Sequence, residues 1–129
     1  MKLEEARMVL QAEWLEPRSN HADSRDREVL SCHASDLMSD VLTDSGVGSV
    51  LLTGLTSTQV VRVAVVSDFA AICFVRGKKP QPEAAKLAEE SQVPLLVTPL
   101  SMYESCGRLY AEGLPVGHKA KEAAGCQKK

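Results

Sequence analysis

Polar and charged residues follow three apolar segments of this chain at the point where each segment ends. The first segment ends in Thr53 and Gly54, the second in Arg76 and Gly77, and the third in Thr98. Hydroxyl, guanidinium and backbone N–H groups together suit a phosphate or carboxylate group. We therefore predict a site for a small anionic ligand, such as a nucleotide, formed by Thr53, Gly54, Thr56, Ser57, Arg76, Gly77, Lys78, Thr98 and Ser101.

A second interpretation of the same residues stays open. Glycine, serine and threonine are also the residues that close turns and cap helices, without any ligand. The sequence contains neither the glycine spacing of a dinucleotide-binding loop nor a phosphate-binding P-loop motif. The nine residues are therefore either a ligand site or ordinary turn chemistry.

No group of residues has the pattern of a catalytic site. His33 lies close to Ser35 and Asp36 in the sequence, but neighbours in sequence do not make a catalytic triad. His21 and His118 fall in polar segments that we expect to be flexible. We find no nucleophile with a base, so we predict no enzyme activity and no cofactor.

A metal site and a redox role are two alternatives that the polar residues leave open. On a helix, Asp36 and Asp40 would share one face, but two carboxylates are weak ligation, so we predict no metal. The four cysteines form no C-x-x-C pair and no zinc pattern. We expect buried reduced thiols, with redox sensing by Cys32 or Cys106 as the alternative.

The three apolar segments predict the central strands of an α/β fold. Residues 50–53, 70–75 and 95–98 are almost continuously apolar, as in parallel strands that are buried on both faces. Parallel neighbours need crossovers, which are usually helices, so we interpret the valine-rich segment 60–66 as a helix although its local propensity favours a strand. We predict a single domain with a mostly parallel sheet of four or five strands and helices on both faces.

The remaining elements follow from hydrophobic spacing and end signals. We predict a helix over 2–11, a short strand over 12–15, an exposed loop over 16–26 and a strand over 27–33. Ser35 is a plausible cap for a helix that turns Leu37, Met38, Val41 and Leu42 toward the sheet. A helix over 82–91 follows, and Ser101 with Glu104 predicts a capped last helix with an apolar face formed by Met102, Cys106, Leu109 and Tyr110.

Length and charge limit the classes of partner. The chain has 129 residues and a net charge of −2, which gives no electrostatic case for nucleic acid. No apolar run approaches the roughly 20 residues that cross a membrane, and the acidic start does not resemble a signal peptide. We expect a cytoplasmic protein with one folded domain over 1–114 and a flexible tail over 115–129.

The central segments resemble those of DRTGG domains. The similar stretches are Ser-Val-Leu-Leu-Thr-Gly at 49–54, Ala-Ala-Ile-Cys-Phe-Val-Arg-Gly at 70–77 and Leu-Ala-Glu-Glu-Ser-Gln-Val-Pro-Leu-Leu-Val-Thr-Pro at 87–99. Such domains occur as regulatory modules in CBS-domain pyrophosphatases and are similar to the N-terminal domain of HPr kinase/phosphorylase. The resemblance covers roughly 1–114 and implies an α/β fold, a regulatory role, a homodimer and no activity of its own.

The chain departs from the family at charged positions. Many members continue Thr-Gly with Asp-Arg, whereas this chain has Leu55 and Thr56, and it has Ser101 where many have Asp. Two functions remain as hypotheses. The first is a self-associating regulatory module that senses a small anionic metabolite. The second is a structural or interaction subunit that docks on a redox enzyme or kinase, for which an exposed apolar patch, including Trp14, would argue.

Overall fold

A five-stranded sheet forms the centre of the computed structural model, which describes residues 1–15, 22–43 and 45–117. Its strands, in the spatial order β1-β5-β4-β3-β2, are parallel except for β1, which runs antiparallel to β5. The mostly parallel α/β sheet is therefore confirmed. The strand bounds are β1 (Glu13–Trp14), β2 (Ser31–Ala34), β3 (Ser49–Thr53), β4 (Ala71–Phe74) and β5 (Leu95–Val97).

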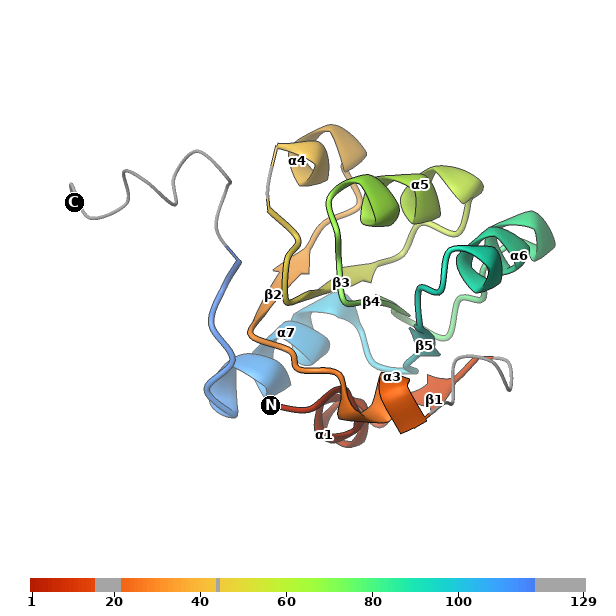
Figure 1. Ribbon diagram of the computed structural model, residues 1–129. Helices are drawn as coiled ribbons and strands as arrows, with labels where there is room; N and C mark the ends of the chain where they lie inside the picture. Colours follow the sequence, from red (N-terminus) through yellow and green to blue (C-terminus); the bar gives the residue numbers. More distant parts are fainter. Residues whose placement is uncertain (16–21, 44, 118–129) are drawn as a thin grey trace.

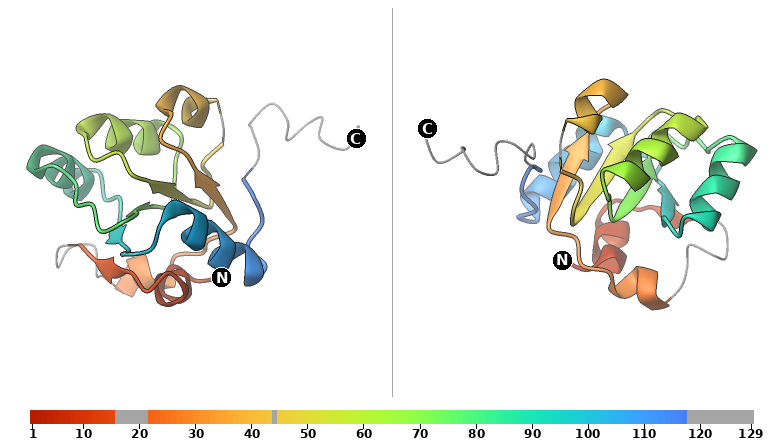
Figure 2. Two further views of the ribbon diagram at one scale, coloured as in Figure 1. Left: turned by 180° about the vertical axis from the view of Figure 1, so that it is seen from behind. Right: turned by 45° about the horizontal axis from the view of Figure 1, so that its top comes forward.

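Helices cover both faces of this sheet (Figure 1). One face carries α4 (Met38–Leu42), α5 (Thr58–Val66) and α6 (Pro82–Glu90), and the other carries α1 (Leu3–Val9), α3 (Ala22–Asp26) and α7 (Met102–Ala111). Figure 2 shows the same two layers from behind and from a tilted direction. Successive strand residues such as Leu51 and Leu52 enter two separate apolar clusters, one under each layer of helices.

The valine-rich segment forms helix α5, as the crossover argument predicts. Val60, Val61, Val63 and Ala64 are buried against the sheet, while Val65 and Val66 are exposed. The segment connects β3 to its parallel neighbour β4. Burial of one helical stripe therefore outweighs the preference of β-branched residues for strands.

The prediction of a loop over 16–26 is wrong where the structure describes that range. Ala22–Asp26 forms helix α3, which packs beside α1 and buries Ser24. Asp23 lies in the first turn and Arg25 in the last, so both charges suit the helix dipole. The rest of the predicted loop, including His21, lies outside the described residues.

Helix α4 begins later than predicted and buries fewer side chains. Its N-cap is Leu37, because the Ser35 hydroxyl accepts a hydrogen bond from the Leu37 N–H at 3.0 Å and forms a local turn instead. Met38 and Val41 face the core, whereas Leu37 and Leu42 are about half exposed, at 57% and 50%. A helix of only five residues presents a single narrow stripe to the sheet, so the predicted four-residue face is wrong.

Helix α7 begins at the predicted cap, but one residue of its predicted apolar face points elsewhere. The Ser101 Oγ accepts a hydrogen bond from the Glu104 N–H at 3.1 Å. Leu109 is buried, and Met102 and Cys106 pack against the same cluster. Tyr110, which we expected in this stripe, is 76% exposed because it lies on a side of the helix that the core does not cover.

The chain returns to the sheet after α7. The Cys32 N–H donates to the Pro115 carbonyl at 3.0 Å, and the Gly117 N–H donates to the Cys32 carbonyl at 2.9 Å. Residues 115–117 therefore run along the outer side of β2, and the rest of the predicted tail lies outside the described residues. In the described ranges no helix is long and apolar enough to cross a membrane.

Two leucines test this packing. Leu52 is fully buried in the cluster under α1 and α7, so Leu52→Ala should lower the free energy of unfolding by about 2–5 kcal/mol in urea titrations followed by circular dichroism. Leu42→Ala, on the exposed side of α4, should change it by less than about 0.5 kcal/mol. Equal losses would contradict the two-layer assignment.

Candidate functional site

The carboxyl ends of the parallel strands collect all nine residues of the predicted ligand site. Thr53 ends β3, and Gly54, Thr56 and Ser57 lie in the loop between β3 and α5. The other five follow β4 and β5: Arg76, Gly77, Lys78, Thr98 and Ser101. The paired register of Thr53 with Phe74, and of Phe74 with Val97, makes these strand ends level with one another.

The innermost donors of this edge are already used by Asp36. Its Oδ1 accepts hydrogen bonds from the Gly54 N–H at 2.6 Å and from the Thr53 hydroxyl at 3.0 Å. The Thr53 hydroxyl also accepts from the Leu55 N–H at 3.1 Å. A carboxylate of the chain itself thus occupies the place where an anion would meet these two donors. Asp36 is not on a helix, so the alternative of a metal held by Asp36 and Asp40 on one helix face fails.

The residues after β5 are also bonded within the chain. The Thr98 hydroxyl is buried, donates to the Leu10 carbonyl and accepts from the Leu100 N–H. The backbone N–H of Gly77 donates to the Thr98 carbonyl at 2.8 Å, and that of Arg76 donates to the Leu100 carbonyl at 2.8 Å. These bonds connect the turn after β4 to the turn after β5 and use the Thr98 hydroxyl and both N–H groups, while the Ser101 Oγ accepts the bond that caps α7.

Four of the nine residues form the outer part of the edge, with side chains that reach solvent. Thr56 and Ser57 are half-buried, and the Ser57 side chain does not cap α5. Arg76 and Lys78 are exposed, and among the described residues neither forms an ion pair. The Gln81 N–H donates to the Thr56 carbonyl at 2.9 Å, which ties the loop before α6 to the loop before α5. We call Thr56, Ser57, Arg76 and Lys78 the outer edge.

Backbone geometry presents Arg76 to solvent. Its φ of 60° lies in the left-handed region, which is uncommon for residues other than glycine. The turn therefore holds an arginine where glycine would cost less strain, directly after a fully buried strand. The guanidinium of Arg76 and the ammonium of Lys78 give the outer edge two positive charges.

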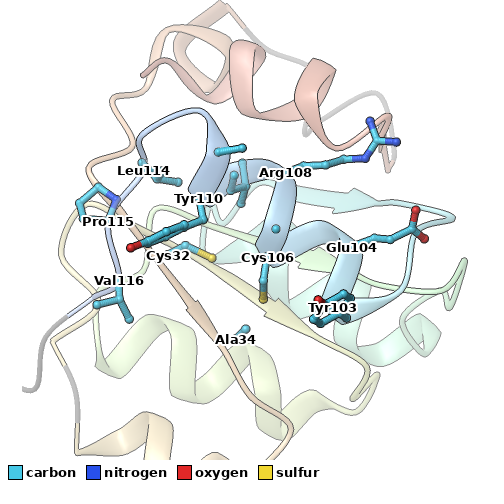
Figure 3. Close-up of a pocket in the computed structure, with 13 residues that line it drawn as sticks. Cys32, Ala34, Tyr103, Glu104, Cys106, Arg108, Tyr110, Leu114, Pro115 and Val116 are labelled. Atoms are coloured by element: carbon cyan, nitrogen blue, oxygen red, sulfur yellow. The ribbon is translucent and has the colours of Figure 1, made fainter.

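A second concave surface, which the sequence analysis missed, lies on the opposite side of the molecule from α4 and α5. This α7 groove encloses about 700 Å³ between α7, β2 and the returning segment 114–116, and its lining is mostly apolar (Figure 3). Its lining includes Cys32, Ala34, Cys106, Tyr110, Leu114 and Val116. A signal for it is present in the sequence, because the spacing of Tyr103, Gly107 and Tyr110 places all three on one helix face.

The thiols of the groove are poor nucleophiles. Burial, with a smaller contribution from nearby Cys106, raises the pKa of Cys32 to about 12. Burial likewise raises the pKa of Cys106, and it raises the pKa of Cys73 inside β4. Because only a thiolate reacts readily, these protonated thiols suit the interpretation as small apolar side chains. Within the described ranges, no three metal-binding side chains cluster.

Comparisons with known proteins identify the fold. No family model and no curated protein matches the sequence. Among solved structures, the chain is similar to the CBS and DRTGG domains of the regulatory region of a Clostridium perfringens pyrophosphatase, complexed with its activator diadenosine tetraphosphate. The TM-score is 0.61 at 14% identity, over 92% of this chain and 51% of that one, so this chain spans about half its length. The DRTGG-like fold implied by the resemblance is confirmed.

Replacing Asp36 tests how much its hydrogen bonds with Thr53 and Gly54 stabilise the fold. Asp36→Ala leaves the buried Thr53 hydroxyl and the Gly54 N–H without their acceptor, so the free energy of unfolding should fall by about 1–2 kcal/mol. The control Asp40→Ala, an exposed carboxylate on α4, should change it by less than about 0.5 kcal/mol. Urea titration measures both, and equal effects would contradict a specific role for Asp36.

Alkylation rates test the protonation of the groove thiols. At about pH 8 a thiol with the raised pKa of Cys32 holds far less thiolate than a free cysteine, so iodoacetamide should modify it at least about a hundredfold more slowly. The rate should rise with pH and reach that of free cysteine after unfolding in urea. Peptide mass spectrometry resolves each cysteine. Fast reaction of folded Cys32 would instead support redox sensing.

Proposed function

We propose that this protein is a non-catalytic regulatory module that binds a small anionic metabolite at the outer edge. The observation that carries the proposal is that Arg76 and Lys78, followed by a third exposed cation at Lys79, lie on a turn that hydrogen bonds hold in place. Thr56 and Ser57 add hydroxyl groups from the adjacent loop. Phosphate groups are commonly bound by such cations together with hydroxyl donors.

The buried and half-buried residues at the strand ends limit where the anionic part of a ligand can bind. Thr53, Gly54, Thr98 and Ser101 fix the positions of the loops through their own hydrogen bonds instead of contacting the anion. The Asp36 carboxylate repels a phosphate placed over them, so the anionic part of a ligand would lie toward Arg76 and Lys78. Gly77 contributes the turn that carries both cations.

The structural neighbour supports a nucleotide as the ligand. The regulatory region of the Clostridium perfringens pyrophosphatase has an activator, diadenosine tetraphosphate, bound in its crystal structure. A nucleotide supplies the phosphate charge that suits Arg76 and Lys78. The similarity to a regulatory region agrees with a role without catalysis, and we further propose that the chain acts in the cytoplasm and self-associates as a homodimer.

A structural or interaction subunit is the second candidate function. The observation that favours it is the exposed apolar groove at α7, which another protein could cover. Trp14 does not contribute to that surface, because it is half-buried against the cluster under α1. Absence of any nucleotide binding together with a stable complex with a redox enzyme or kinase would favour this candidate over the first.

Calorimetric titration with diadenosine tetraphosphate, ATP and inorganic phosphate, each alone, tests the proposed ligand class. We expect at least one nucleotide to bind. The double variant Arg76→Asn with Lys78→Gln should weaken that binding at least about tenfold, because it removes both cations. Asparagine tolerates the positive φ of position 76, so the turn should keep its shape.

A matched control separates local charge from net charge. Lys86→Gln removes an exposed cation from α6, away from the strand ends, and should leave the affinity unchanged. Failure of the unaltered chain to bind either nucleotide would contradict the ligand proposal. Equal weakening by the control and the double variant would show unspecific attraction and would also contradict it.

A further inference from the structure

Helix α7 exposes two large aromatic side chains on one face. Tyr103 is 89% exposed and Tyr110 is 76% exposed, and their spacing of seven residues places them two turns apart on the same side. Both border the α7 groove, one toward each end of the helix (Figure 3). Exposed tyrosines beside an apolar groove are typical of a protein interface.

Gly107 lies between these tyrosines at a position where no contact with the described residues requires glycine. Gly107 occupies the interior of α7, where glycine costs about 1 kcal/mol relative to alanine. A Cβ at this position would meet nothing within 4 Å, and its φ is not in the left-handed region. Neither packing against the described residues nor backbone shape therefore requires glycine here. A small residue on an exposed helix face does allow a second helix to approach closely.

The charged side chains of α7 can pair with those of a second, antiparallel α7 helix. Glu104 and Arg108 are both exposed, and neither forms an ion pair among the described residues. If two copies of α7 pack antiparallel about a two-fold axis near Cys106, Glu104 of each copy faces Arg108 of the other. The same axis brings Tyr103 of one copy opposite Tyr110 of its partner. A two-fold interface requires this kind of self-complementary pattern.

We propose that the α7 groove is filled by a second copy of this chain, with the two α7 helices antiparallel and crossing between Cys106 and Gly107. Tyr103 of each copy enters the groove of the other and covers Cys106, Leu114 and Val116. Two reciprocal Glu104–Arg108 pairs fix the register. This inference rests on the self-association in the proposed function and locates its interface, and it is independent of the ligand site at Arg76.

Charge-reversal variants of the full chain test the interface by native mass spectrometry and sedimentation. The unaltered chain should be a dimer. Glu104→Arg and Arg108→Glu should each raise the dimer dissociation constant at least about tenfold, because like charges then face each other twice. An equimolar mixture of the two variants should form a dimer with one copy of each, since one copy then carries cations at both positions and the other carries carboxylates at both.

The outcomes separate this interface from the proposed function. Both substitutions lie on the exposed face of α7, and thermal melts should show folded variants with only slightly lowered melting temperatures, because each variant places like charges four residues apart on the helix. A dimer that survives both single variants would overturn the α7 interface while keeping self-association. A monomeric unaltered chain would overturn both. Nucleotide affinity measured on the same variants should not change, so the ligand proposal stands or fails by its own titration.

Discussion

The parallel pairing of β3 with β4 is the constraint on which the rest of the structure depends. Two parallel strands cannot be joined by a tight turn, so the chain must cross over the sheet between them. The crossover α5 covers one face, and the other face of the same strands still has to be buried. Leu51 and Leu52, adjacent in sequence, enter opposite clusters, which requires the second layer formed by α1 and α7. The two layers and the level strand ends follow from this one pairing.

Much of this architecture could be predicted from the sequence, because burial on both faces leaves a strong pattern. The central strands and the Ser101 cap depend on side chains within a few residues of one another, and helix α5 follows from its place between two parallel strands. Two errors arose where a distant contact decides the outcome, whereas the late start of α4 follows from a local turn at Ser35. Helix α3 is stabilised by its packing on α1, and the exposure of Tyr110 depends on how α7 lies over the sheet.

The candidate site also combines features that the sequence could predict with features that depend on distant contacts. Its nine residues could be assigned to the strand ends because parallel strands end at one edge of a sheet. Which of them are free could not be predicted, because that depends on Asp36, which precedes Thr53 by 17 residues and accepts the hydrogen bond of its hydroxyl. The Thr98 hydroxyl bonds the carbonyl of Leu10, 88 residues away. Only the tertiary structure separates polar residues that hold the loops from those that face solvent.

The segment after α7 has a consequence for aggregation. Unpaired edge strands can recruit strands of other molecules and grow into open-ended fibrils. Here the hydrogen bonds from Cys32 to Pro115 and from Gly117 to Cys32 occupy that side of β2, and Pro115 has no N–H to offer an incoming strand. A Cβ at position 117 would collide with the imidazole ring of His33, so a larger residue there requires either that ring or the returning segment to move. If the segment moves, the outward N–H and C=O of Cys32 lose these partners and become available for pairing with the strand of another molecule.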